Sequence, residues 1–136
     1  NGFIKLDNVP VLRIAEAYLN RAEAQATPGS PVYNPAEALL DLKVIKSRRY
    51  TGYTGSAIEI ADNALTPAQL LVEIIRQRRI EFAFEGHRFF DLKRLGADLV
   101  KSPHYNTVAF TDTRILAPIP QAEVDGNPNL KQNAGY

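Results

Sequence analysis

Hydrophobic residues recur every three or four positions in the first part of the chain, which is the spacing of one face of a helix. A first helix is therefore predicted from about Pro10 to Ala26, with an apolar stripe formed by Val11, Ile14, Ala15, Tyr18, Ala22 and Ala26. Proline suits the first helical turn, where its missing N–H would have no partner within the helix. The stretch 27–31 contains two prolines and a glycine, and it predicts the end of this helix.

A second helix is predicted from Asn34 to about Arg49. Asn34 is suited to cap the first backbone N–H groups, Pro35 to occupy the first helical position, and Glu37 to complete a start similar to a capping box. Basic residues gather at the other end, where they favour the negative end of the helix dipole; they are Lys46, Arg48 and Arg49. Residues 50–55 contain two glycines and are predicted to form a loop.

The third helix is predicted from Thr66 to about Glu85, and it opens with a second capping sequence that contains proline. One face of it combines Leu71, Ile74, Ile75, Arg78, Phe82 and Glu85. Two charged residues therefore interrupt an otherwise apolar stripe, and a buried charge costs several kcal/mol unless it is paired. We predict a structural ion-pair network in which a glutamate of the first helix neutralises Arg78; its members are Glu16, Glu23, Arg78, Glu81, Glu85 and Arg88.

Gly86 is expected to end the third helix, and a short helix is predicted from His87 to Leu95. Residues 97–136 have no helical periodicity and contain four prolines, which indicates an irregular tail that wraps the helices. The apolar stretch 115–120 within it is expected to be extended, because of its prolines. The whole pattern predicts an all-α protein of tetratricopeptide-like helix pairs with an irregular, proline-rich C-terminal wrapping tail, as a single domain spanning 1–136.

Composition narrows the classes of function. The 136 residues carry a formal net charge of +1 with acids and bases interspersed, so nothing favours binding to nucleic acid or to an anionic membrane surface. The absence of cysteine removes disulfides, thiol catalysis and most zinc sites from consideration. No signal peptide, lipidation motif or long apolar run is present. The chain also lacks methionine and opens at Asn1-Gly2-Phe3, so we expect a piece of a longer protein, and the missing targeting signal excludes little.

Glu81 and Glu85 lie one predicted helical turn apart, with about 5–6 Å between their Cβ atoms. This separation is close to that of the two carboxylates of a retaining glycosidase. Both glutamates project from one helix face, however, whereas glycoside hydrolysis needs carboxylates on two sides of the bond. Neighbouring arginines would also keep them ionised, which is the wrong state for a general acid. Structural pairing is favoured, and a glycoside-processing enzyme is the third alternative.

No metal or cofactor site is predicted. His87 has the single carboxylate of Glu85 nearby, and His104 lies in a remote, irregular stretch, whereas a transition-metal site needs several converging ligands. The serines have neither a nucleophile-elbow nor a triad context. The residues by themselves therefore indicate no cofactor and favour no catalytic site.

The end of the second predicted helix and the loop after it contain the candidate ligand-binding residues Arg49, Tyr50 and Tyr53. Tyrosine combines an apolar ring with a hydrogen-bonding tip, and sugars present both apolar faces and hydroxyls. Tyrosines in loops also commonly pack against neighbouring residues of the protein, so ligand binding and structural packing both stay open as interpretations. A second alternative is a tetratricopeptide-like module that binds a protein or peptide in a concave helical groove, lined by side chains such as Arg13 or Asn20.

Four segments, read together, resemble a known family pattern. They are 10–24 (PVLRIAEAYLNRAEA), 78–94 (RRIEFAFEGHRFFDLKR), 116–120 (LAPIP) and 127–136 (NPNLKQNAGY). Their content and order resemble the C-terminal region of the SusD/RagB family, the starch-utilisation-type nutrient-binding lipoproteins. The resemblance covers essentially the whole chain, and the second segment is its most specific part.

The resemblance implies a surface-exposed, lipid-anchored protein of the outer membrane of a Gram-negative bacterium, built mainly of tetratricopeptide-like helix pairs. Members of this family capture oligosaccharides, or in some branches peptides, and deliver them to a SusC-like TonB-dependent transporter without catalysis. The family's lipid-bearing N-terminal cysteine is absent from these residues, which implies a C-terminal fragment. Ligand contacts in the family come largely from regions N-terminal to this segment and from variable loops, so the resemblance assigns no binding residue here.

Overall fold

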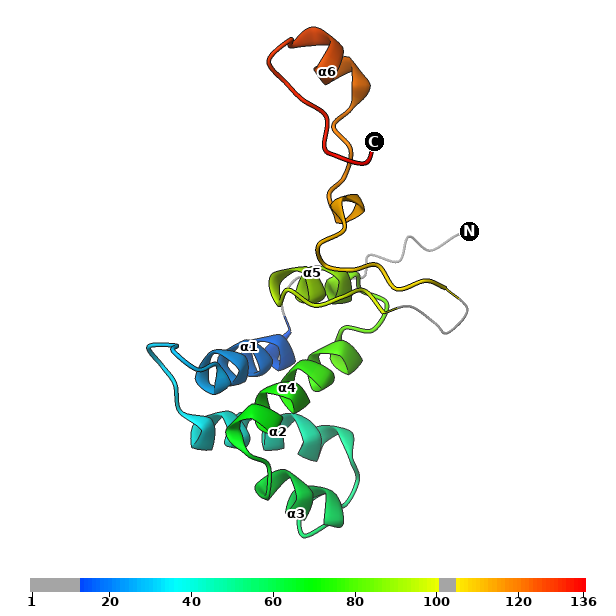
Figure 1. Ribbon diagram of the computed structural model, residues 1–136. Coiled ribbons are helices and arrows are strands. Elements are labelled where there is room, and N and C mark those ends of the chain that lie inside the picture. The colour runs from blue at the N-terminus through cyan, green and yellow to red at the C-terminus, as the bar shows by residue number, and fades with distance from the viewer. Residues whose placement is uncertain (1–12, 101–104) are drawn as a thin grey trace, which may run out of the picture. The chain divides into compact units, whose positions relative to one another are not determined.

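The computed structural model describes residues 13–100 and 105–136, apart from the side chain of Arg114, and it is helical (Figure 1). The elements in chain order are α1 (Ile14–Ala26), α2 (Pro35–Arg49), α3 (Ala57–Asn63), α4 (Pro67–Glu81), α5 (His87–Arg94), the 3-10 turn η1 (Thr113–Ile115) and α6 (Gln121–Gly126). In these two ranges the extended pairing is limited to one antiparallel bridge, between Leu99 and Val108. The predicted all-α class is confirmed.

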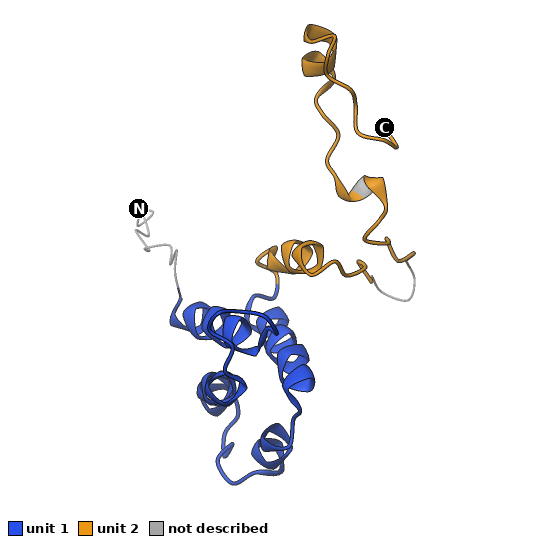
Figure 2. Ribbon diagram, turned by 60° about the vertical axis from the view of Figure 1, so that its left-hand side comes forward, with its two compact units in different colours: residues 1–83 blue, residues 84–136 orange. Residues whose placement is uncertain are grey.

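The chain divides into two compact units, residues 1–83 and residues 84–136 (Figure 2). In unit 1, α1 contacts both α2 and α4, and α2 also contacts α3 and α4 (Figure 1). The core between these helices consists of Leu19, Ala22, Ala26, Ala38, Leu42, Ile45, Leu70, Ile74 and Phe82. Its alanines allow the helix axes to approach closely, while each fully buried leucine or isoleucine contributes about 1.5–3 kcal/mol.

The predicted starts of α2 and α4, which rested on capping residues in the sequence, are confirmed. The side chain of Asn34 accepts a hydrogen bond from the backbone N–H of Glu37 at 3.3 Å. Thr66 and Gln69 form a complete capping box at the start of α4. The predicted end of α2 at Arg49 is also confirmed, and the Tyr50 N–H closes its last turn on the Lys46 carbonyl at 2.8 Å.

The start of the first helix is corrected. Arg13 has extended backbone angles, φ −118° and ψ 140°, and α1 begins at Ile14. The prediction of one helix running from Pro10 is therefore wrong, since Arg13 interrupts it. Pro10 and Val11 themselves lie outside the described residues, as does His104.

Helix α3 was not predicted. Its N-terminus is capped by Ser56, whose hydroxyl accepts a hydrogen bond from the Glu59 N–H at 3.2 Å. The pattern Ser56-x-x-Glu59 is a capping signal that was present in the sequence. A seven-residue helix is marginal by itself, however. The tertiary contacts of its buried Asp62, described below, hold it in place.

The end of the third predicted helix is also corrected, because α4 ends at Glu81 rather than near Glu85. The Phe82 N–H still reaches the Arg78 carbonyl, at 3.0 Å, but Phe84 and Gly86 then take left-handed conformations with φ 65° and 81°. A helix cannot continue through such residues. Glu85 therefore lies in a turn, outside the stripe that contains Arg78, and it is not one helical turn from Glu81.

Unit 2 contains the predicted short helix, α5, which ends at Arg94 and is followed by Gly96 with φ 65°. The tail beyond it is less irregular than predicted, because α6 occupies Gln121–Gly126. Gln132 fixes the extended stretch before α6: its side chain accepts a hydrogen bond from the Ile119 N–H and donates one to the Ile119 carbonyl, both at 2.8 Å. That the tail wraps the helices stays a prediction.

Candidate functional site

A cavity of about 630 Å³ opens in unit 1 beside the first turns of α1, the last turns of α2 and the end of α4. Its lining residues are Ile14, Ala15, Tyr18, Val44, Ile45, Arg48, Arg49 and Glu81, and we call it the α1–α2 cavity. Each of the two helices contributes residues one helical turn apart, such as Ile14 with Tyr18 and Val44 with Arg48, because positions i and i+4 share a face. Its volume is in the range of cavities that hold small ligands.

The walls of the α1–α2 cavity are mainly aliphatic, and parts of them face water. Ile14 is 78% exposed and Val44 is 38% exposed. Tyr18 is the one aromatic lining residue, and the guanidinium of Arg21 lies 5.4 Å from the centre of its ring. The cavity therefore offers one aromatic ring and mostly branched aliphatic carbon to a ligand.

The charged edge of the α1–α2 cavity is formed by Arg49 and Glu81, which bind each other. Nη2 of Arg49 lies 2.5 Å from Oε2 of Glu81, and its Nη1 donates to the side-chain oxygen of Gln77. Arg13 approaches from the other side, with Nη2 donating to the Glu81 carbonyl at 3.2 Å and Nη1 at 3.9 Å from its carboxylate. Glu81 thus sits between two guanidinium groups as a structural link between α1, α2 and α4.

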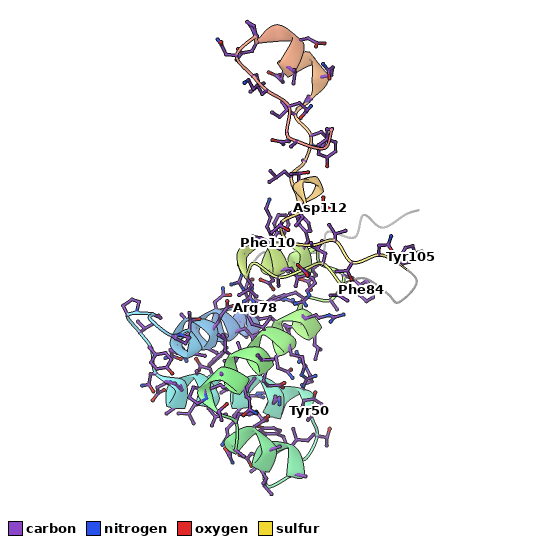
Figure 3. All side chains as sticks on the ribbon, viewed as in Figure 1. Tyr50, Arg78, Phe84, Tyr105, Phe110 and Asp112 are labelled. Atoms are coloured by element: carbon purple, nitrogen blue, oxygen red, sulfur yellow. The ribbon has the colours of Figure 1, made fainter. Side chains whose placement is uncertain are left out.

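The three predicted ligand-binding residues have different surroundings. Arg49 lines the α1–α2 cavity, and Tyr50 is half-buried at the end of α2 (Figure 3). Tyr53 is only 3% exposed, and its hydroxyl donates a hydrogen bond to Oδ2 of Asp62 at 2.7 Å. Burial, together with this hydrogen bond, raises the pKa of Tyr53 above its ordinary value. Tyr53 therefore has no ring face open to a ligand within unit 1.

Arg78 lies at the packed interface of α1 and α4 (Figure 3). Its Nε is 3.5 Å from Oε2 of Glu23, its Nη1 donates to the side-chain oxygen of Asn20, and its guanidinium stacks 5.4 Å from the centre of the Phe82 ring. Glu23 is thus the glutamate of α1 that faces Arg78. The interface surrounds a buried cation with a carboxylate, an amide oxygen and an aromatic face.

The other predicted network members are distributed differently. Glu16 is half-buried on α1 and has no ion-pair partner within 13–100 and 105–136. Glu85 and Arg88 belong to unit 2, where Glu85 is exposed in a turn and Arg88 is half-buried in the first turn of α5. Arg13 and Asn20, the residues suggested for a peptide groove, are occupied by Glu81 and Arg78 and do not line the α1–α2 cavity.

A second buried ionic cluster was missed by the sequence analysis. Nζ of Lys46, in a residue only 3% exposed, lies 2.6 Å from Oδ1 of Asp62 and 2.7 Å from Oε1 of Glu73. It joins α2 to α3 and α4, while Arg76 and Gln77 donate further hydrogen bonds to Glu73 at 2.7–2.9 Å. In the sequence, Lys46 was interpreted as a cation that favours the negative end of the α2 dipole, because it stands in the last turn of that helix. Its burial comes from packing against α3, which was not predicted.

Glu73 should make the stability of unit 1 depend on pH in the acid range. Burial alone would raise its pKa, but hydrogen bonds from Arg76, Lys46 and Gln77 outweigh burial and lower the pKa from 4.5 to about 2. A folded-state pKa below the unfolded value means that the contribution is complete above about pH 4.5 and is lost as the pH falls toward 2. Its size is about 2–3 kcal/mol after allowance for partial exposure.

Urea unfolding measured from pH 5 to pH 2.5 tests this expectation. The wild-type protein should lose stability over this range more steeply than the variant Glu73→Gln, whose side chain does not titrate. Glu37→Gln, which changes an exposed glutamate in the first turn of α2, is the matched control and should retain the wild-type slope. Equal slopes for the wild type and Glu73→Gln would contradict the role assigned to Glu73.

Two kinds of feature are absent from the part of the chain that the structure describes. No three histidine, aspartate or glutamate side chains there are grouped so that they could hold a metal ion. No helix in those residues has both the length and the apolar character needed to cross a bilayer.

Comparison with known proteins identifies the family. A model of the SusD family matches residues 4–136. This chain belongs to the SusD family. The family consists of binding proteins of the outer-membrane surface rather than enzymes, and the tetratricopeptide-like helical fold predicted from the sequence agrees with it.

Two relatives of this SusD-family chain come from Bacteroides. The starch-binding protein SusD of Bacteroides thetaiotaomicron is 28% identical over 138 residues, an alignment that covers 95% of this chain and 22% of that protein. A crystal structure named "Putative sugar binding protein" from Bacteroides vulgatus ATCC 8482 is 33% identical and has a TM-score of 0.69, covering 97% of this chain and 31% of that one. The SusD-family chain therefore spans between a fifth and a third of the length of these relatives.

Proposed function

We propose that the protein to which this chain belongs captures glycans at the outer cell surface without catalysis and delivers them to a SusC-like TonB-dependent transporter. The observation that carries the proposal is the match of the SusD family model to residues 4–136. A relative named for starch binding and a solved relative named for sugar binding support the ligand class. Attachment to the outer membrane through an N-terminal lipid belongs to the same proposal.

The contacts within unit 1 support a scaffold role for this chain. Glu81 is held between Arg13 and Arg49, and Glu85 lies outside α4, which supports structural pairing of Glu81 over a catalytic role. Arg49 and Tyr50 remain the proposed ligand contacts, whereas Tyr53 is committed to Asp62. We infer that the main glycan contacts lie in the part of the protein beyond residues 1–136, because the relatives are more than three times as long.

A glycan array followed by affinity gels tests the proposal, with the full-length protein and the 136-residue chain run side by side. We expect the full-length protein to bind polysaccharide and to be retarded in the corresponding gel, and the chain alone to migrate as it does without polysaccharide. The variant Tyr50→Ala in the full-length protein measures the contribution of the α2 terminus, with Tyr33→Ala, another solvent-accessible tyrosine, as the matched control. If the full-length protein bound no glycan at all, the proposal would fail and the tetratricopeptide-like peptide-binding alternative would replace it.

A further inference from the structure

Side-chain hydrogen bonds join residues 132–136 to the proline-rich segment 116–120, which lies beside them in unit 2 (Figure 1). We call residues 132–136 the clasp. The side-chain amide of Gln132 accepts a hydrogen bond from the Ile119 N–H and donates one to the Ile119 carbonyl, both at 2.8 Å. This exchange of two hydrogen bonds is the pattern of directly opposed residues in an antiparallel sheet. The Gln132 amide therefore takes the place of one peptide group of a neighbouring strand.

Two further side chains of the clasp bind neighbouring backbone groups. Nδ2 of Asn133 donates a hydrogen bond to the Ala117 carbonyl at 2.6 Å. The hydroxyl of Tyr136 donates one to the Leu116 carbonyl at 2.9 Å. The backbone N–H of Asn133 also donates to the side-chain oxygen of Gln132 at 2.9 Å, which orients that amide. The clasp therefore covers successive backbone groups of the segment with side-chain partners, as a paired strand would cover them with its backbone.

The positions of the prolines distinguish the two edges of segment 116–120. Backbone groups of successive residues in an extended chain face opposite edges, and Ala117 and Ile119 both face the clasp. Pro118 and Pro120 have no N–H, so the edge away from the clasp lacks their donors, which is the placement that an edge strand tolerates. The edge toward the clasp keeps its donors and acceptors. An uncovered edge of that kind pairs readily with another strand.

We propose that the clasp prevents the edge formed by Ala117 and Ile119 from pairing with the same edge of a second copy of the chain. With the clasp closed, Gln132 and Asn133 occupy the backbone groups that a partner strand would need. With the clasp open, the edges of two copies match each other, because antiparallel pairing of identical segments has two-fold symmetry. The inference concerns unit 2 alone and does not depend on glycan binding.

The double variant Gln132→Ala, Asn133→Ala of the full-length protein tests this inference. Amide hydrogen exchange at Ile119 should become about ten-fold faster or more, since each lost hydrogen bond changes the opening equilibrium by up to about ten-fold. Sedimentation velocity should then show self-association at concentrations about ten-fold lower than for the wild type. Gln121→Ala is the matched control, because it removes an amide that binds only the side chain of Asp125 within α6, and it should leave both measurements unchanged.

Adding Ile119→Pro to the double variant removes the N–H donor of the edge, so self-association should return to the wild-type concentration range. Unchanged exchange in residues 14–81 shows that unit 1 stays folded, and the single variant Gln132→Ala should give smaller shifts of the same sign. The inference is overturned if exchange at Ile119 does not rise, or if it rises without self-association. Association that persists after Ile119→Pro would also overturn it, because the copies would then pair elsewhere.

Discussion

Replacing Arg78 by alanine is expected to lower the free energy of unfolding by about 3–5 kcal/mol. The guanidinium is buried at the α1–α4 interface beside Glu23, Asn20 and the ring of Phe82. Alanine would remove this cation from beside the Glu23 carboxylate, and it would open a void against the aromatic ring. Both consequences act on the same pair of helices, so α1 and α4 should separate more readily.

Urea denaturation of the protein, followed by circular dichroism at the helix band, measures the effect. Arg79→Ala is the matched control, because it removes the same side chain from the next, exposed position of α4 and should change stability by less than about 0.5 kcal/mol. Arg78→Lys should fall between the two, since it keeps the charge but loses the planar fork and the stacking on Phe82. Unfolding midpoints for Arg78→Ala and Arg79→Ala that coincide would refute the role given to Arg78.

Lys46→Ala is expected to be comparably damaging, again by about 3–5 kcal/mol. Its ammonium group is the shared partner of two carboxylates, Asp62 at 2.6 Å and Glu73 at 2.7 Å. Without it, two like charges would face one cavity in the protein interior. Because Asp62 belongs to the short helix α3, the first consequence should be the release of that helix, and backbone hydrogen exchange in 57–63 should rise before global unfolding.

The matched control for Lys46 is Lys43, which stands one turn earlier on α2. Lys43 pairs with Glu59 at 3.4 Å with 24% of its side chain exposed, so Lys43→Ala should cost no more than about 1 kcal/mol. The triple variant Lys46→Met, Asp62→Asn, Glu73→Gln removes every charge of the cluster and should recover much of the lost stability. A single variant Lys46→Ala as stable as Lys43→Ala would show that the cluster is not a fixed link.

Local chemistry decided which helix boundaries could be predicted. Asn34 with Pro35, and Thr66 with Pro67 and Gln69, satisfy the free N–H groups of a helix start whatever the rest of the fold does, so those starts were predicted correctly. The end of α4 depends on tertiary packing instead. Burial of Phe82 against the core and a left-handed phenylalanine at position 84 override a helical pattern that would otherwise continue to Glu85.

The two buried cations, Arg78 and Lys46, also differ in how far their pairing could be predicted from local sequence. A helical wheel placed Arg78 on a buried stripe, so its need for a carboxylate was predictable, and Glu23 stands opposite it. Lys46 gave no such signal, because its burial depends on α3, a seven-residue helix that only tertiary contacts stabilise. The spacing of apolar residues indicates which face of a long helix is buried. It does not indicate which side chains are buried by a short helix that packs beside it.

The candidate ligand residues show a further limit of reasoning from composition. Tyr50 and Tyr53 are three positions apart in a loop with two glycines, and both looked equally available from the sequence. The structure buries Tyr53 against Asp62, 9 residues further along the chain, and leaves Tyr50 half-buried. Whether a loop tyrosine packs or projects is decided by a contact with an element that follows it, so no local rule distinguishes the two.

The hydrogen bond between Arg13 and the Glu81 carbonyl joins residues 68 positions apart and so closes nearly the whole of unit 1 into one loop. The α1–α2 pair needs only the short connection 27–34 to close. Once that pair has formed, the connection still to be closed is 50–66, about twice the length of 27–34, so docking α4 costs about 0.6 kcal/mol more chain entropy than closing the pair. Unit 1 can therefore assemble in two steps. The α1–α2 pair can form from local contacts, and the packing of α4 onto it then relies on the ion pairs of α4 with Arg13, Arg49 and Glu23 as well as on apolar burial.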